Sequence, residues 1–522
     1  LGLDRGLSDA LILAAERHDL GKADIRFQAM LIGASTDFAA MQPKLWAKSD
    51  RGEAARRVPV GLMVEESTTD LLPIGFRHEM LSLQLATRLG DGLEAPDREL
   101  MLHAIAAHHG HARPWAPVVD DTDPVGVTIG AELFEGVASL RLSVAERAAW
   151  EAHRLDSGVS ERFWRLNRRF GWWGLAWLES ILRLSDWVAS SQPRSVAGQV
   201  RFQTDNDVVV AEQKSEIHLA GIPGINPLGF LTALGVFRAV TEALPNQAVR
   251  LAWTQAGGWH PVLFINDDVS EDQLISLLDE KLKDREDEPQ FVRLGKNTNV
   301  DRDLFRQAAI EAIGCADADD RTFVDFLAAF GSDALVSIDD GRTIQDTALR
   351  TMAGAGHQHF LDTMRNLIRN CKAEHIRKVL FDRWRYDDPT QTLSLRFDPV
   401  DDNRYALRWR NPSGDPGRKT SGSMLGANRL AIEAIPVLTT APGDRRLMTA
   451  GFTGSRSSDT FFHWPLWTVP TDLSTVRSLL VSRELLSGAT AESIRRRGVA
   501  SVMRSQRITV GKVRNFTQAT AD

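Results

Sequence analysis

Histidines and aspartates suited to metal binding occur at four separate points in the first 190 residues. They are the pair His18-Asp19 followed by Lys22, then His78, His108-His109 and Asp186. Divalent metals used for hydrolysis need deprotonated nitrogen and oxygen ligands that converge from several elements. Each of the four points lies on or at the end of a predicted helix, so a helical scaffold is able to bring them together. The pattern therefore predicts a site for metal-assisted hydrolysis.

Taken singly, a histidine of this kind is more often a core or surface residue than a metal ligand. The four points together favour a site. His108 and His109 end an apolar helix, where two imidazoles both need polar partners. Asp186 lies in an apolar, tryptophan-rich helix, where a buried carboxylate without a cation would be costly. Two other histidines match no position of the pattern: we expect His103 to pack in the core and His111 to lie in a loop near the site.

The two halves of the chain differ in their predicted elements. A chain of 522 residues exceeds the roughly 250 to 300 residues at which one core stops growing, so we expect several domains. The first half is predicted to be all-α, with helices over 8–19, 76–90, 98–109, 144–155, 159–169 and 172–190. After residues 190–195 the pattern becomes α+β, with helices over 227–243 and 268–287 and strands within 207–213, 215–222, 392–398, 404–410 and 445–452. We place the domains at 1–195 and 214–522.

A resemblance gives the four points a more specific meaning. The series H-D-x-G-K, R-H-E, H-H-G-x-x-R-P and S-D-W resembles the HD nuclease domain of the CRISPR-associated helicase-nuclease of type I interference systems. The stretch "HHGHARPWAP" is similar to the form found in the type I-G (formerly I-U) branch. The resemblance implies one or two divalent ions, either a transition metal (Mn, Ni, Fe or Co) or Mg, and cleavage of single-stranded target DNA. It implies these metal ligands: His18, Asp19, His78, His108, His109 and Asp186.

The same resemblance implies roles beyond metal binding. Lys22 would act beside Asp19 in catalysis by neutralising a phosphate or the developing charge. Because the substrate strand must pass the site, Arg113 is a further candidate phosphate contact. The family also has a histidine on a helix that precedes the HD pair, and this sequence begins too late to contain it. We therefore expect the chain to be the end of a longer protein, with a helicase domain upstream.

Two stretches of the second half resemble the large-subunit family of type I-G Cascade effectors. They are "NPLGFLTALG" at 226–235 and "GANRLAIEAIPVL" at 426–438. From the residues alone, 226–243 is equally well a core helix whose glycines allow close approach of another backbone. Before the second stretch, a Gly-, Pro- and Ser-rich loop carries Arg418 and Lys419, which are candidate nucleic-acid contacts, although most surface loops of this composition are only loops.

The charge of the chain restricts where nucleic acid could bind. A net charge of −7 argues against uniform attraction to phosphates, so binding requires local basic patches. Residues 495–514 hold seven Arg or Lys and no acid, and we expect an amphipathic helix followed by a strand. A solvated charged face is the alternative to an anionic partner. The candidate contacts in this run are Arg495, Arg496, Arg497, Arg504 and Arg507.

Membrane insertion and a disulfide framework are not expected. The longest apolar run, 172–190, contains Glu179, Arg183 and Asp186, each of which would cost ~2.5 kcal/mol or more within a bilayer. We therefore expect a core helix there. Two cysteines, Cys315 and Cys371, fit a reducing cytoplasm.

The sequence thus predicts a CRISPR-Cas defence protein in which a metal-dependent DNA nuclease is fused to a Cascade-like region. That region would bind crRNA and target DNA among the other crRNA-guided Cascade subunits. One alternative is an HD phosphohydrolase acting on nucleotides. The absence of a basic groove around His108 and Asp186 would favour it. The other alternative is a non-catalytic DNA-binding effector subunit, and failure to bind metal would favour that one.

Overall fold

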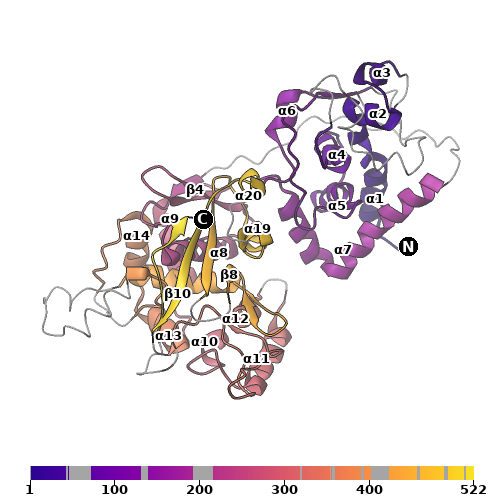
Figure 1. The fold of residues 1–522 in the computed structure, drawn as a ribbon. Helices are drawn as coiled ribbons and strands as arrows, with labels where there is room; N and C mark the ends of the chain where they lie inside the picture. The colour runs from indigo at the N-terminus through magenta and orange to yellow at the C-terminus, as the bar shows by residue number, and fades with distance from the viewer. Residues whose placement is uncertain are drawn as a thin grey trace, which may run out of the picture. The chain divides into compact units, whose positions relative to one another are not determined.

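The chain folds into two compact units, Leu1–Val210 and Ala211–Asp522 (Figure 1). The computed structural model describes residues 2–42, 45, 72–130, 139–191, 215–317, 320–352, 354, 359–388, 393–400, 423–454, 459–486, 492–510 and 513–521. The division into units falls between the two predicted domains, 1–195 and 214–522. The predicted fold class, a helical first region followed by a mixed α and β region, is confirmed.

The first unit is mainly helical. Its helices are α1 (Arg5–Arg17), the 3-10 helix η1 (Leu20–Ala23), α2 (Ile25–Ile32), α3 (Thr36–Ala40), α4 (His78–Ala86), α5 (Ala95–Ala107), α6 (Val144–Ala149) and α7 (Val159–Ser191). The helix predicted over 144–155 is shorter than expected, because the backbone becomes extended at Trp150. A small antiparallel hairpin, β1 (Val127–Ile129) with β2 (Leu140–Leu142), was not predicted, since three-residue strands are too short to show alternation.

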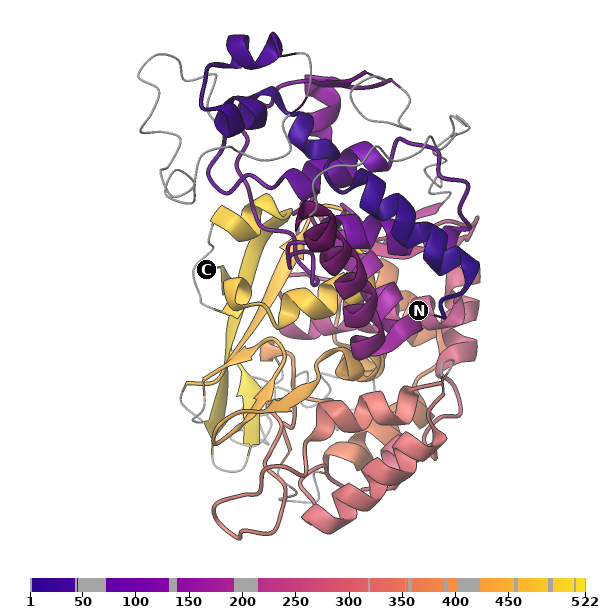
Figure 2. The same cartoon turned by 90° about the vertical axis from the view of Figure 1, so that its right-hand side faces the viewer.

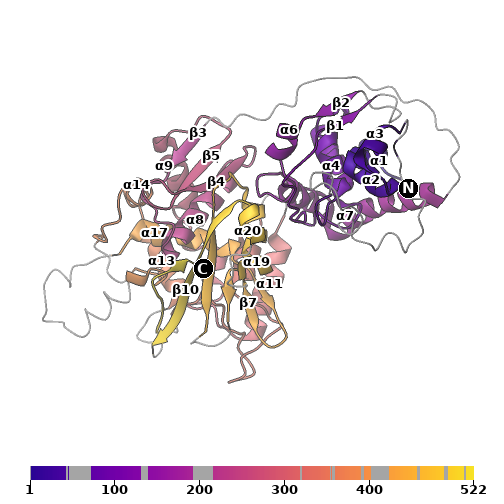
Figure 3. The same cartoon turned by 45° about the horizontal axis from the view of Figure 1, so that its top comes forward.

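Among its described residues, the first unit contains two apolar clusters. The larger one joins α1, α4, α5 and α7 through buried side chains such as Leu13, Leu83, Ile105 and Leu178. The smaller one packs Leu20, Leu81 and Leu85 against the β1–β2 hairpin, which lies beside α4 in Figure 3. Burial of this kind is the main favourable term in folding. Helix α4 therefore packs into both clusters, with Leu83 in the larger one and Leu81 and Leu85 in the smaller one.

Helix α7 differs from the predicted core helix. It joins the two predicted helices, 159–169 and 172–190, across a kink at Gly171, whose φ is 69°. Leu175, Leu178 and Leu182 on one face are buried. Four tryptophans away from this face are exposed: Trp172, Trp173, Trp177 and Trp187. The apolar run 172–190 is therefore only partly buried. Within the described part of the chain, no helix has the length and apolar character needed to cross a bilayer.

The second unit combines helices with small antiparallel sheets (Figure 2). Its helices are α8 (Pro227–Ala243), α9 (Glu271–Leu282), α10 (Pro289–Val292), α11 (Arg302–Cys315), α12 (Thr322–Phe330), α13 (Phe360–Asn370), α14 (Ala373–Phe381), α17 (Leu425–Ala434), the 3-10 helix η6 (Ile435–Val437), α18 (Leu473–Leu480), α19 (Arg483–Leu486) and α20 (Glu492–Arg496). Asn226 caps α8 by accepting from the backbone N–H of Leu228 at 2.8 Å. A Cβ at Gly235 would overlap the carbonyl oxygen of Leu430 in α17, so the predicted close backbone approach is confirmed.

In the described part of the second unit, three antiparallel sheets accompany these helices. The first has the strand order β3 (Ser215–His218), β5 (His260–Ile265), β4 (Val249–Thr254). The second has the order β11 (Val513–Phe516), β10 (Val499–Val510), β9 (Phe461–Trp467), β8 (Phe452–Thr453), and β12 (Thr520–Ala521) also pairs with β10. The third pairs β6 (Thr440–Pro442) with β7 (Leu447–Thr449). The strand predicted over 392–398 is wrong for the described residues 393–398. There the N–H of Leu395 donates to Oδ1 of Asn428 at 2.7 Å, and its carbonyl accepts from Oγ1 of Thr351 at 2.8 Å. These side chains satisfy the backbone groups that a neighbouring strand would otherwise bind. The predicted strands over 207–213 and 404–410 lie outside the described residues.

Candidate metal centre

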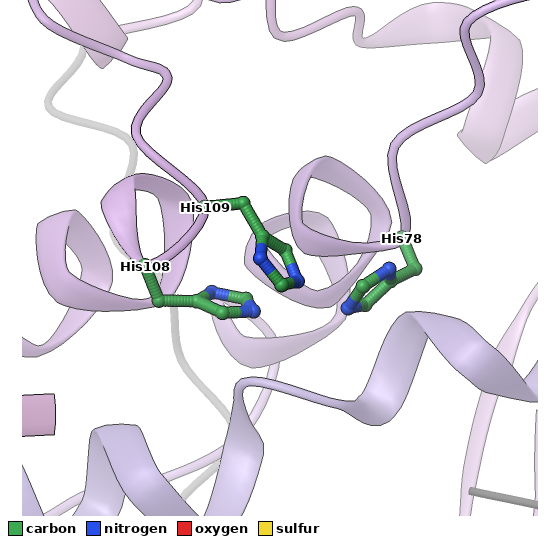
Figure 4. Close-up of side chains that lie close together, drawn as sticks. All are labelled: His78, His108 and His109. Carbon is green, nitrogen blue, oxygen red and sulfur yellow. The ribbon is translucent and has the colours of Figure 1, made fainter. Parts of the chain in front are cut away.

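Three helix ends and the turn after α1 supply the candidate ligands in the first unit. His18 is the C-cap of α1, and Asp19 follows it as the N-cap of η1. His78 is the first residue of α4, and His108 is the C-cap of α5, with His109 next in the chain. The side chains of His78, His108 and His109 converge in Figure 4. We call His18, Asp19, His78, His108 and His109 the His/Asp cluster.

The cluster contains two overlapping groups of potential ligands. One ligand atom from each of His78, His108 and His109 lies within 4.8 Å of the others, and the same holds for His18, Asp19 and His108. His108 belongs to both groups. The ring centroids of His108 and His109 are 4.1 Å apart, and those of His78 and His109 are 5.0 Å apart. The sequence-predicted residues are thus brought together from positions up to 91 residues apart, the separation of His18 and His109.

Asp186 approaches the cluster from α7 but is less buried than expected. Its Oδ1 lies 3.5 Å from Nε2 of His18. Its side chain is 31% exposed, so the prediction of a buried carboxylate is wrong. The reason is that Asp186 lies close to the exposed face of α7, where its neighbour Trp187 is 58% exposed.

The donor set fits a divalent metal. Nε2 of His18, Nε2 of His78 and Nε2 of His108 are all buried, and among the described residues none has a hydrogen-bond partner. A buried polar atom without a partner costs free energy that a ligand can recover. Imidazole nitrogens with nearby carboxylate oxygens suit Mn, Fe, Co, Ni or Zn, and oxygen donors suit Mg.

The surroundings lower the pKa of two potential ligands, His108 and Asp19. Burial, together with the neighbouring His109, lowers the pKa of His108 to about 3, although its hydrogen bond to the Ile105 carbonyl opposes this. Burial would raise the pKa of Asp19, but the contact with His78 at 3.3 Å and the charges of His18 and Lys22 outweigh burial and hold it well below its usual value. Nζ of Lys22 lies 2.7 Å from Oδ2 of Asp19. At neutral pH His108 is therefore a neutral imidazole and Asp19 an ionised carboxylate.

The comparisons with known proteins give one match. Residues 3–194 match the family model described as "Cas3, HD domain". The first unit carries a Cas3-type HD domain. That family comprises CRISPR-associated nucleases, metal-dependent hydrolases that act on nucleic acid. No curated protein and no solved structure matches the chain.

All six predicted ligands lie within the matched range of the Cas3-type HD domain. Their metal binding stays a prediction, because the match names the domain and not its ligands. The second unit lies outside the match. Its resemblance to a Cascade large subunit therefore also stays a prediction.

Arg113 of the Cas3-type HD domain is held by a carboxylate that sequence reasoning missed. Its guanidinium is ion-paired with Glu179 of α7. The other carboxyl oxygen of Glu179 lies 2.7 Å from Nε2 of His103, which is 1% exposed, so the prediction of a core role for His103 is confirmed. This chain of contacts, from the exposed Arg113 to the buried Glu179 and His103, ties the loop after His109 to α7. The sequence signal that could have indicated this partner was the position of Glu179, an acidic residue inside the apolar run 172–190.

Glu79 was also missed, although it belongs to the R-H-E motif. It follows His78 directly in the first turn of α4 and is 1% exposed. A carboxyl group so deeply buried is uncommon unless it has a partner or a role. From this motif, only His78 was predicted as a candidate metal ligand.

The C-terminal basic run of the second unit has the predicted order, a helix followed by a strand, but the helix is short. It begins in α20, which ends at Arg496, and β10 then extends from Val499 through twelve residues. The five predicted nucleic-acid contacts lie in different surroundings. Arg495 is exposed, Arg496 pairs with Glu492, and Arg497 is buried against Glu484. Arg504 lies over the ring of Phe461, and Arg507 donates to the carbonyl of Ala348. Burial lowers the pKa of Arg507 to about 10. A single exposed cationic face is therefore wrong. Arg418 and Lys419 lie outside the described residues.

Proposed function

We propose that the Cas3-type HD domain is a DNA endonuclease that cuts single-stranded target DNA in CRISPR-Cas antiviral defence. It would use one or two divalent ions, either a transition metal (Mn, Ni, Fe or Co) or Mg. The observation that carries the proposal is the pair of overlapping ligand groups that share His108, with three buried imidazole nitrogens directed inward. Asp186, 3.5 Å from His18, would complete the ligand set.

The residues of the centre divide the work between binding and charge neutralisation. A divalent ion would polarise a phosphodiester oxygen and make water more acidic. Lys22, 2.7 Å from Asp19, would hold that carboxylate in place and offset the charge of the substrate phosphate. Arg113 would meet the strand from the loop after His109. Its pairing with Glu179 limits where the guanidinium can go, which favours a fixed phosphate position.

The second unit would join the nuclease to a crRNA-guided complex. We propose that it acts as a large-subunit-like part of a type I-G Cascade effector in the cytoplasm, in contact with crRNA and target DNA. The two stretches that carry the resemblance belong to α8 and α17, which pack together without space for a side chain at Gly235. Joining both units in one chain would hold the nuclease near the displaced strand at an effective concentration of roughly millimolar. We propose that a helicase, in the same chain or another, supplies the unwound strand.

Nucleotide phosphohydrolysis is the second candidate. The observation that favours it is that Lys22 and Arg113, the two predicted phosphate contacts near the cluster, are both paired with carboxylates. A small phosphate ester needs fewer cations than a DNA strand. A non-catalytic, DNA-binding subunit is the third reading and requires that the centre bind no metal.

The test is cleavage of circular single-stranded DNA by the full chain with Mn²⁺, Ni²⁺ or Mg²⁺. We expect metal-dependent cutting that EDTA abolishes and that is lost in His18→Ala and Asp186→Ala. His218→Ala is the matched histidine control, because this side chain lies in the second unit and is 58% exposed. Hydrolysis of nucleoside triphosphates without DNA cutting would favour the second candidate. DNA binding with neither activity nor metal binding would leave the non-catalytic reading.

A further inference from the structure

The histidines of the cluster differ in what contacts their outer ring nitrogen. Nδ1 of His18 lies 2.7 Å from the carbonyl oxygen of Ala15, and Nδ1 of His108 lies 2.7 Å from that of Ile105. Both are C-cap residues that reach a carbonyl three positions back in their own helix. A carbonyl oxygen only accepts, so Nδ1 must carry the proton in each ring. The lone pair of Nε2 is then directed into the cluster.

His78 cannot use the same device. It is the first residue of α4, so no helical carbonyl lies one turn before it. Its Nε2 lies 3.3 Å from Oδ1 of Asp19, on the cluster side. Its Nδ1 instead lies 3.7 Å from Oε2 of Glu79. Among the described residues, the other oxygen of Glu79 is buried without a hydrogen-bond partner.

We propose that Glu79 is the positioning residue for His78, accepting the proton of Nδ1 so that the Nε2 lone pair faces the metal. The distance of 3.7 Å is longer than a hydrogen bond, and a small rotation of either side chain closes it when Nε2 is engaged. A carboxyl group behind a ligating histidine fixes its tautomer and makes it a stronger ligand. The inference rests on the proposed function only in one respect, namely that the ligand of Nε2 is a metal ion.

The burial of Glu79 supports this role over a structural one. A 1% exposed carboxyl group that makes no hydrogen bond to the described residues, and whose ion-pair contact is Nδ1 of His78 at 3.7 Å, is a costly way to stabilise the fold. Leucine has a similar volume and no such cost. Replacing Glu79 by Leu should therefore keep or raise the stability of the metal-free protein while weakening metal binding. A structural role would give the opposite pattern.

The first measurement is Mn²⁺ affinity of the full chain, read from the EPR signal of free Mn²⁺. We expect Glu79→Leu to weaken the affinity about 10- to 100-fold, the usual effect of losing such a partner. Glu79→Gln, whose amide oxygen still accepts from Nδ1, should restore part of the loss. Glu94→Gln is the control, because this exposed N-cap residue of α5 makes no capping bond from its side chain. Affinities of Glu79→Leu and the parent within twofold would overturn the proposal.

The second measurement needs no metal. Long-range ¹H–¹⁵N spectra of the ¹⁵N-histidine-labelled, metal-free chain report which ring nitrogen carries the proton. We expect His78 to change from the Nδ1–H form to a mixture in Glu79→Leu, while His18 and His108 keep theirs. An unchanged His78 signal would overturn the inference. If the parent binds no Mn²⁺ but the His78 tautomer still depends on Glu79, the proposed function fails and the role of Glu79 stands.

Discussion

At the scale of single residues, His108 is the most critical side chain of the centre because both ligand groups contain it. We predict that His108→Ala lowers DNA cleavage by more than the roughly 100-fold that loss of an outer partner causes. His109→Ala leaves the group of His18, Asp19 and His108 intact, so its loss should be smaller. Cleavage rates and the number of Mn²⁺ bound per chain provide the measurement. A greater loss in His109→Ala than in His108→Ala would contradict the assignment.

The ligand set was largely predictable from the sequence, whereas its supporting residues were not. His18, Asp19, His78 and the His108-His109 pair stand out because several metal-binding residue types recur at helix ends. Partners such as Glu179 depend on contacts across 66 residues or more, as in its pairing with Arg113. The same limit applies to Arg497 and Arg507, whose burial depends on the sheet and not on local charge.

At the scale of elements, the glycine of the H-D-x-G-K motif sets the distance between η1 and α4. The N–H of Gly21 donates to Oγ of Ser82 at 2.8 Å, and that hydroxyl donates to the carbonyl of His78 at 2.9 Å. A Cβ at position 21 would overlap the same carbonyl oxygen. Since Asp19 lies just before Gly21 and His78 begins α4, this contact brings two candidate ligands together.

We predict that Gly21→Ala pushes η1 away from α4, costs about 1 to 3 kcal/mol of stability as overpacking does, and weakens Mn²⁺ binding. Thermal unfolding and Mn²⁺ titration of the same samples test this. Gly174→Ala in α7 is the matched control, because its Cβ would meet the nearest described atom, Cβ of Phe170, at an ordinary 3.4 Å. It should be neutral or stabilising, since alanine is the better helix former. Undiminished Mn²⁺ affinity in Gly21→Ala would refute the role of this contact.

Most helices were predictable because their apolar periodicity is long. The ends of the helices were less predictable: α4 ends at Ala86 instead of the predicted 90, and α6 ends at Ala149 instead of the predicted 155. The stretch 393–398 has the alternation of a strand, yet its backbone groups are bonded by Asn428 and Thr351. Alternation reports which side chains are buried, and it does not report which group satisfies the backbone.

At the scale of the whole molecule, both units bury charged groups. The first unit buries imidazoles of the candidate metal centre and, elsewhere, an ion cluster in which Asp24 contacts Arg26 and Arg147. The second unit buries an ion cluster in which Glu433 of α17 contacts Arg238, Arg285 and Arg429. Burial alone would raise the pKa of Glu433, but the three arginines outweigh burial and lower it to about 2. Its usual pKa is 4.5.

A carboxyl group whose pKa is lowered by folding stabilises the fold fully above its unfolded pKa and loses that effect as the pH falls toward its folded pKa. We therefore predict that Glu433→Gln destabilises the second unit by about 3 to 5 kcal/mol at pH 7, and that its difference from the parent shrinks between pH 4.5 and pH 2. Urea unfolding followed by tryptophan fluorescence measures this, because Trp253, Trp464 and Trp467 are fully buried in this unit. The exposed Glu280→Gln is the control and should change the unfolding free energy by less than about 0.5 kcal/mol. A difference that stays constant from pH 7 to pH 2 would mean that Glu433 stabilises α17 by packing and not by charge.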